Sequence, residues 1–454
     1  MNGVTYYLFL IVSALIILRS LYDFSMFVLA VTWLKRNLNV SKKQEGPQFI
    51  VVITVLWEQH TLRATVESLL RSSYNADGLR VVIVTTEKEF IKSFPISVSS
   101  TVDLAKQLQE QHPYRVFHLH YPKCVGAKAE QMNYAIDWIL TDTTQNDRDV
   151  FVAFYDADSR PHPETFQVVA GLSLDRNQRV FQQSSIFFQN FKELREEQGA
   201  ISGSVLQANA ILQTRWTLTH EIPRILRQSY ALHHWHRRMF LSHCVGHGLF
   251  LRKDLLREVR RMPTKTMTED LFLGFVLSLR SEPIQAIPVL ESADMPRSIS
   301  AAARQKYVWY FGPLDHLAYA RHVLQDKLCS APTWLTFSFA LRGLVPALAW
   351  LLSGWMSLFV IIYALASLQL WTLVISAGVL AFYLSTFVVT AGLHVWLHKF
   401  TGQQSSIRPI ECAWAMAFLL PTLVLHSIPP IFSLVVKLWS VVTGIKPHKP
   451  KTEE

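Results

Sequence analysis

Charged side chains are scarce in this sequence. Asp, Glu, Lys and Arg make up 17% of the 454 residues, whereas a soluble protein of this size usually carries about a quarter. The deficit lies at the two ends of the chain, and the middle has the composition of an ordinary water-soluble domain. This distribution argues against two soluble domains and predicts membrane segments on both sides of one globular domain.

Cysteine is also rare, and the four residues present form no C-x-x-C pair. The sequence therefore gives no support for a disulfide framework, and it is compatible with reduced thiols in a cytosolic compartment. We expect these cysteines to be small, buried apolar side chains. They are Cys124, Cys244, Cys329 and Cys412.

Nucleic-acid-binding motifs, which combine basic and stacking aromatic residues, are absent as well. The formal net charge is nevertheless +10, and its positive residues lie beside the apolar segments, at 35–43 and 446–451. Basic flanks on one side of a bilayer are typical of membrane proteins. We therefore expect a lipid bilayer as a partner and no nucleic acid.

The first apolar stretch covers residues 5–34, which exceeds the ~20 residues that a helix needs to span a bilayer. It is too long for a signal peptide, lacks a basic start, and ends in Lys35 and Arg36 without a small-residue cleavage site. Arg19 and Asp23, four residues apart, can pair on one helix face. We expect a retained anchor, with the charges that follow it in the cytosol.

Three more apolar stretches occupy the C-terminal third, at 344–365, 370–397 and 413–442. The last contains three prolines, so it can form two short spans, a re-entrant pair or one kinked helix. The basic loop 399–408 and a basic tail in the cytosol require an even number of crossings, which favours two short spans. Residues 334–341 could form an amphipathic piece at the interface.

These stretches divide the chain into three parts. We expect an N-terminal anchor with a basic linker (1–46), a central domain (47–331), and C-terminal interfacial and transmembrane helices with a basic tail (332–454). The protein is thus predicted to be a multi-pass protein of the cell membrane or an inner membrane, with its central domain in the cytoplasm.

In the central domain, short apolar runs alternate with helical periods. The apolar runs at 49–55, 80–84, 114–119 and 150–155 read as buried strands, and 61–70 and 129–140 read as helices. This alternation predicts an α/β fold of the Rossmann type, with a mostly parallel sheet covered on both faces. Ligands of such sheets lie beyond the carboxyl ends of the strands.

Asp156 and Asp158 directly follow the fourth predicted strand. Two carboxylates at this spacing can approach one hard cation, and Mg²⁺ or Mn²⁺ prefers such oxygen ligands, usually shared with substrate phosphates. The cation would neutralise charge on a leaving diphosphate. The alternative is a surface turn, because D-x-D triplets are common by chance.

A second acidic motif is Thr268-Glu269-Asp270, which precedes an apolar helical stretch. One interpretation is helix capping, with Thr268 as the N-cap and the acids in the first turn. The other makes Asp270 a general base that takes a proton from an acceptor hydroxyl.

A third motif runs from Arg304 and Gln305 to Trp309. The indole offers a flat face to a sugar ring, and Arg304 and Gln305 can bind hydroxyls or phosphate. An amphipathic helix that approaches the membrane would explain the same residues. A separate group of histidines, at 233, 234 and 236, lies among basic residues. This setting indicates a membrane-facing surface better than a metal site.

Taken in order, these motifs resemble the membrane-integrated family 2 glycosyltransferases, which have a GT-A fold and C-terminal membrane helices. This group includes cellulose, hyaluronan and chitooligosaccharide synthases and ceramide glucosyltransferases. The similarity covers most of the chain: anchor, Glu58, Lys128, D-x-D, a glycine-rich strand, T-E-D, Q-x-x-x-W and membrane helices. It implies inverting transfer of a sugar from a nucleotide diphosphate, commonly UDP, to a carbohydrate or lipid acceptor.

The resemblance also implies roles for individual residues. The donor would contact Glu58, Glu87, Lys128, Asp156, Arg304 and Gln305. Asp158, together with Asp156, would hold the metal. Gly246, His247 and Trp309 would lie on the acceptor side. Glu269 and Asp270 would be catalytic, with Asp270 as the base.

This chain departs from the group at two places. Thr85-Thr86-Glu87 replaces the usual Asp-rich turn, and Val308 stands where an arginine usually precedes the tryptophan. Arg304 or Lys306 could supply the missing charge. Polymer synthesis with export and a single transfer to a lipid both remain open, and a transporter or channel subunit with a regulatory domain is the alternative from another class.

Overall fold

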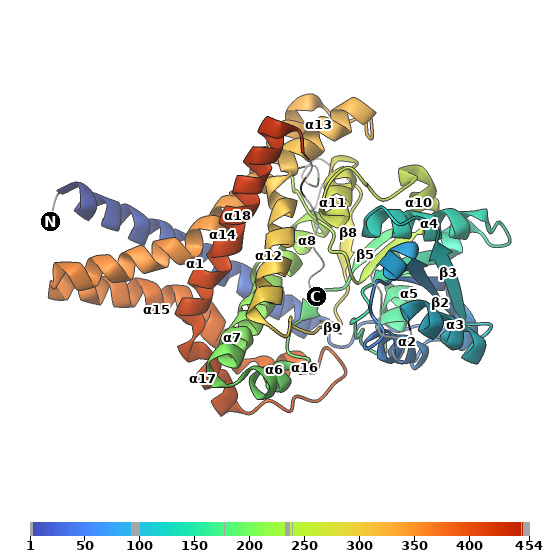
Figure 1. Ribbon diagram of the computed structural model, residues 1–454, viewed down its shortest axis with the longest axis horizontal. Coiled ribbons are helices and arrows are strands. Elements are labelled where there is room, and N and C mark those ends of the chain that lie inside the picture. The colour runs from blue at the N-terminus through green and yellow to red at the C-terminus, as the bar shows by residue number, and fades with distance from the viewer. Residues whose placement is uncertain are drawn as a thin grey trace.

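The computed structural model describes residues 3–91, 100–176, 178–231, 237, 239–445 and 447. The expectations for the histidines at 233, 234 and 236, and for the basic residues after 445, fall outside these ranges. Within them, an α/β domain carries a group of long apolar helices at one end (Figure 1).

A seven-stranded sheet with the order β3-β2-β1-β4-β7-β5-β8 forms the centre of the domain. β7 runs antiparallel to its two neighbours, and the other pairs are parallel. The sheet is therefore mostly parallel, as predicted. Its strands are β1 (Gln48–Thr54), β2 (Leu79–Thr86), β3 (Val116–Tyr121), β4 (Val150–Tyr155), β5 (Val180–Gln182), β7 (Leu249–Arg252) and β8 (Ile284–Ala286).

Successive side chains of the strands point to opposite faces of the sheet, and helices cover both faces. Ile50 and Val52 pack towards α4 (Lys128–Thr141). Phe49 and Val51 pack on the opposite face with residues of three helices. These helices are α2 (Leu62–Leu70), α3 (Thr101–Gln111) and α5 (Thr165–Arg176). Because side chains alternate with a period of two, a run of apolar residues is needed to bury both faces.

A second layer of helices joins the sheet to the apolar helices. α7 (Ala200–Trp216) continues through a π-helical turn, η4 (Thr217–Glu221), into α8 (Ile222–Ser229). α10 (Lys253–Val259), α11 (Glu269–Leu279), α12 (Ile299–Leu314) and α13 (His316–Asp326) follow. A small parallel pair, β6 (Ser185–Ile186) and β9 (Glu291–Ser292), brings distant segments together beside the sheet.

Within the described ranges, four helices are long and apolar enough to cross a bilayer. They are α1 (Gly3–Arg36), α14 (Thr333–Ser367), α15 (Leu370–Gly392) and α18 (Leu419–Thr443). The predicted pair within α1 is confirmed, because Arg19 Nε lies 3.0 Å from Asp23. Asp23 also pairs with Arg215 of α7.

Residues 334–341, expected to form an amphipathic piece at the interface, are the first turns of α14. The last apolar stretch forms α17 (Pro409–Ala417) and one continuous helix, α18, not two short spans. Pro430 has no N–H for the carbonyl of His426, but Trp350 Nε1 donates to that carbonyl at 2.9 Å. A neighbouring helix thus satisfies the group that the proline leaves open.

Candidate active site

The turn after β4 places two carboxylates at the carboxyl end of the parallel strands. The Asp156 N–H donates to the Ser159 hydroxyl at 3.1 Å, and the Ser159 N–H donates back to the Asp156 carbonyl at 3.2 Å. Asp158 is in a strongly acidic environment. Burial, and then the charges of Asp156, Asp294, Glu58 and Glu291, raise its pKa to about 8.

Lys128 links the carboxylates to the next part of the site. It is the first residue of α4, and its ammonium forms an ion pair with Asp156 and donates to the Gly246 carbonyl at 3.1 Å. Burial opposes its charge, but Asp156, Glu269 and Asp270 together raise its pKa. Lys128 is therefore a cation that three carboxylates share.

Gly246 shows how closely these groups approach one another. A Cβ at this position would lie 3.2 Å from Asp270 Oδ2 and 3.4 Å from Lys128 Nζ. Any side chain would therefore stand between the base candidate and the lysine. The structure brings Asp156, Lys128, Gly246 and Asp270 together at one place.

Asp270 lies in the first turn of α11, as predicted. Its Oδ1 accepts a hydrogen bond from the N–H of Leu271 at 2.8 Å. The Thr268 hydroxyl does not cap the helix, because it bonds the Tyr319 hydroxyl at 2.6 Å instead. Glu269 is 5% exposed and contributes to the field at Lys128. The first turn of α11 thus points a carboxylate into the site without a threonine cap.

His247 occupies a firmly held turn before β7. Gln182 Nε2 donates to its carbonyl at 2.7 Å. Its Nδ1 lies 3.0 Å from Glu291 Oε2 and 3.1 Å from the Ser185 hydroxyl. Burial alone would lower the pKa of His247, but Glu291, Asp156 and Glu221 raise it to about 9. A partly buried imidazolium therefore lies beside the carboxylates.

Glu291 and Asp294 are acidic residues of this site that sequence reasoning missed. Both add negative charge at Asp158. Glu291 belongs to β9, which pairs with β6 and so reaches the site from a distant part of the chain. Their only signal in the sequence is E-S-A-D after a short apolar run, and this pattern has no distinctive spacing.

The two glutamates predicted to lie at the nucleotide end of the site, Glu58 and Glu87, have different neighbours. Glu58 acts on Asp158 through its charge, and its Oε2 accepts from the Thr61 hydroxyl at 3.1 Å. Glu87 lies after β2, where its Oε1 is 3.1 Å from His120 Nε2. Trp57, just before Glu58, has a φ of 57°, which is rare for a bulky residue and typical of ligand clamps.

The motif on α12 lies beside α11. Gly312 of α12 packs on Leu271 and Thr268. Lys306 turns inward, where its Nζ donates to Gln213 Oε1 at 2.7 Å and lies 4.3 Å from the centre of the Trp309 ring. Burial lowers the pKa of Lys306 to about 7.

Gln305 and Trp309 complete this motif on α12. Gln305 Oε1 is buried and has no hydrogen-bond partner among the described residues. Lys306 lies over the Trp309 ring and donates to Gln213 of α7, so this part of the motif packs towards α7.

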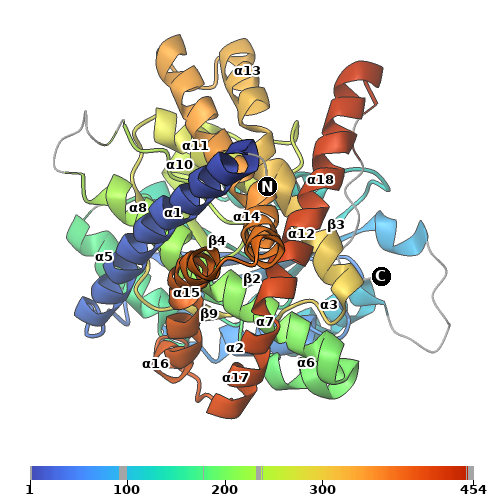
Figure 2. The ribbon, with the colours of Figure 1, turned by 90° about the vertical axis from the view of Figure 1, so that its left-hand side faces the viewer.

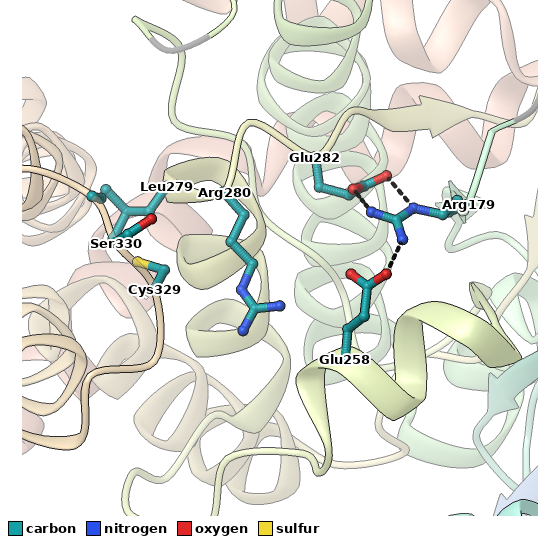
Figure 3. Close-up of a pocket in the computed structure, with 8 residues that line it drawn as sticks. Arg179, Glu258, Leu279, Arg280, Glu282, Cys329 and Ser330 are labelled. Carbon is teal, nitrogen blue, oxygen red and sulfur yellow. Dashed lines mark hydrogen bonds and ion pairs between the residues drawn. The ribbon is translucent and has the colours of Figure 1, made fainter.

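Two cavities lie away from these carboxylates. One, of about 430 Å³, is lined by Arg179, Glu258 and Glu282. Figure 3 shows Arg179 held between the two glutamates, with Nη1 2.6 Å from Glu258 Oε1. This cluster ties the edge of the sheet to α10. The other, of about 690 Å³, lies between α4 and α11 and includes Tyr134 and Arg260.

A mostly parallel α/β sheet that includes one antiparallel strand and has acidic residues at its strand ends is typical of the GT-A class of glycosyltransferases. Within that class, the chain belongs to the glycosyltransferase-like family 2, whose model matches residues 47–312. It is therefore an enzyme that uses nucleotide-sugar donors.

Solved structures show similar chains at low identity. The mannosyltransferase PcManGT from Pyrobaculum calidifontis, in complex with GDP-Man and Mn²⁺, is 15% identical over 94% of this chain and 99% of its own, with a TM-score of 0.48. S. aureus TarS 1-349 is 13% identical over 88% of this chain and 93% of its own, with a TM-score of 0.39. No curated protein matches the chain significantly.

Proposed function

We propose that the protein transfers one sugar from a nucleotide diphosphate, with UDP as the first candidate, to a lipid hydroxyl at the cytosolic membrane face, with inversion. The observation that carries this proposal is the convergence of Asp156, Lys128 and Asp270 around Gly246. The ammonium of Lys128, which would bind phosphate, and the carboxylate of Asp270, the candidate base, lie close together, as a direct displacement requires.

Asp156 and Asp158 are proposed to hold Mg²⁺ or Mn²⁺. A partly buried carboxyl among four other acids has the donor chemistry that such a cation needs,. Among the described residues, no three His, Cys, Asp or Glu side chains are grouped closely enough to hold a metal alone. The diphosphate oxygens would complete the shell, and the bound cation would neutralise their charge.

Asp270 is proposed to take the proton of the acceptor hydroxyl as the sugar is transferred. Lys128 would hold the diphosphate and Asp156 in place while the bond to the sugar breaks. Glu58 and Glu87 would lie at the nucleotide end. Arg304, Gln305 and Trp309 would border the site from α12, and Gly246 and His247 from the acceptor side.

A lipid acceptor is favoured over polymer export by the composition of the apolar helices. Residues 3–18 and 343–398 contain no Asp, Glu, Lys or Arg, and the candidate spans number four. Such a set offers little room or polarity for a polysaccharide channel. Family membership as an enzyme gives no support to the alternative of a transporter subunit.

The test is a panel of nucleotide sugars with the full chain in detergent or lipid, with and without Mn²⁺ or Mg²⁺. A single lipid-mobile product supports the proposal, and a ladder of sizes supports polymer synthesis instead. Asp270→Asn should lower turnover by roughly 10²- to 10⁴-fold, the usual range for a general base, while donor binding persists. Asp137→Asn, at an exposed ion pair with Arg261, is the matched control. Full activity of Asp270→Asn would refute the assignment of the base.

A further inference from the structure

Three helical segments extend beyond the α/β domain without any charged side chain. They are the part of α1 before Arg19, the part of α14 after Trp350, and the part of α15 before Thr386. Figure 1 shows them projecting together from one end of the molecule. At 1.5 Å per residue each segment is about 25 Å long, which approaches the ~30 Å of a bilayer core.

An ionic cluster marks the base of this projection. Arg19 pairs with Asp23, which also binds Arg215 of α7. Arg215 Nε in turn donates to the Thr386 hydroxyl of α15 at 2.8 Å. The polar groups on α1 and α15 therefore lie at the same level, as expected for helices that leave the hydrocarbon together.

α18 does not join this projection. It packs along helices of the α/β domain, with the Ser433 hydroxyl donating to the Tyr307 carbonyl of α12 at 2.9 Å and Lys437 paired with Asp315. Near its other end, the Thr422 hydroxyl lies 3.4 Å from the Val205 carbonyl of α7. α18 is thus fixed to the domain along most of its length.

α18 crosses α14 at the level where the projection begins. The Gly354 N–H donates to the Ser427 hydroxyl at 3.0 Å, and a side chain at Gly354 would overlap the backbone of α18. Figure 2 shows α15 and part of α14 end-on, whereas α18, like α1, is seen along its length. α18 therefore runs across the direction of α15 and of the outer part of α14.

The outer face of α18 is a continuous apolar stripe. Its side chains recur at helical spacing and are 39–82% exposed, whereas the opposite face is buried against the domain. Such a pattern is typical of a helix that lies in a membrane interface. The stripe consists of Leu425, Phe432, Val435, Trp439 and Val442.

We propose that α18 lies in the plane of the membrane, at the interface on the side of the catalytic domain, with this stripe in contact with lipid. The chain then crosses the bilayer three times, through α1, α14 and α15. A crossing α18 would carry the Lys437–Asp315 pair and its contacts with α12 towards the hydrocarbon, at a high cost for buried charge.

Spin labels in lipid nanodiscs test this arrangement. Single cysteines at 425, 432 and 442 of the full chain, with the four native cysteines replaced by serine, should lie at similar depths. Matched labels at Val4, Ile11 and Leu18 of α1 should pass through a maximum of depth. If α18 spans instead, positions 425 and 442 differ by about 25 Å along the bilayer normal, and that result overturns the proposal.

A second measurement needs no cysteine replacement. A protease-cleavable tag at the C-terminus of the native chain, in sealed vesicles, should be cleaved from the same side as the catalytic domain. Cleavage from the opposite side would overturn the proposal. Neither measurement depends on catalysis, so its outcome is separate from that of the transfer assay.

Discussion

The imidazole of His247 is charged because of where the fold places acids around it. Glu291 of β9, Asp156 after β4 and Glu221 of η4 raise its pKa to about 9, above the ordinary ~6.5. A pKa raised in the folded state stabilises the protein fully below about 6.5, and this stabilisation is lost as the pH rises through about 9.

We therefore expect wild-type unfolding free energy to fall between pH 6.5 and 9 by roughly 2–3 kcal/mol from this residue. Glu291→Gln should flatten that slope, because it removes the hydrogen-bonded carboxylate. Chemical unfolding of the wild type and of Glu291→Gln at several pH values measures how the unfolding free energy of each protein depends on pH. Glu282→Gln, whose carboxylate binds Arg179 instead, is the control. An unchanged slope in Glu291→Gln would contradict the assigned charge.

Lys128 is expected to govern donor affinity. Lys128→Met removes the cation that holds Asp156 and faces the Gly246 carbonyl, and loss of a charged hydrogen bond costs about 1.5–3 kcal/mol. The donor KM should rise by roughly tenfold or more. Lys123→Met, an exposed lysine on the same loop, should behave like the wild type. Equal donor KM in both variants would exclude the role of Lys128.

The sequence predicted residues of this site where one short motif carried the signal. Asp156 and Asp158 follow a buried strand, and Asp270 opens a helix, so local pattern placed them correctly relative to the sheet and α11. Glu291 and Asp294 escaped because the pairing of β6 with β9 brings them in. The left-handed backbone of Trp57 has no sequence signal, since only the surrounding structure enforces it.

Among the elements, the contact of α1 with α7 contains a buried ion pair. Asp23 is 1% and Arg215 8% exposed at their side chains. Removal of one partner leaves the other charge buried and uncompensated, which costs about 3–5 kcal/mol. Asp23→Ala should therefore lower thermal stability strongly. A small effect would mean that other groups or water compensate Arg215.

The double variant Asp23→Leu with Arg215→Met provides the comparison. It removes both charges at once, so it should recover much of the stability that Asp23→Ala loses. Thermal unfolding of the three proteins in one lipid mixture checks this. A double variant as unstable as Asp23→Ala would contradict an electrostatic origin.

At the level of elements, the strands were predicted better than the C-terminal helices. β1, β2, β3 and β4 match the apolar runs closely, because buried parallel strands need both faces apolar. The prolines of the last stretch predicted a break. Pro430 is tolerated because Trp350, 80 positions earlier in the sequence, supplies a hydrogen bond to the open carbonyl. No local pattern could reveal that donor.

For the whole molecule, the two features that matter are one catalytic sheet and one set of charge-free helix ends. Composition alone predicted both, because the scarcity of charge at the termini separated apolar helices from the soluble middle. It did not predict which apolar helices project and which lie against the domain, since hydropathy is similar for all four. Packing partners decide that question.

As membrane spans, the three projecting ends would favour a bilayer of a particular thickness. At about 25 Å they are shorter than the ~32–33 Å core of sterol-rich plasma membranes and closer to the ~27 Å of thinner ones. Because a mismatch costs free energy for every ångström of deformation, transfer should be fastest in nanodiscs of short-chain phosphatidylcholine and should slow as the acyl chains lengthen. A rate independent of chain length would show that the helix ends tilt freely. If the rate does fall as the acyl chains lengthen, bilayer thickness would favour this enzyme in the thinner membranes of a cell.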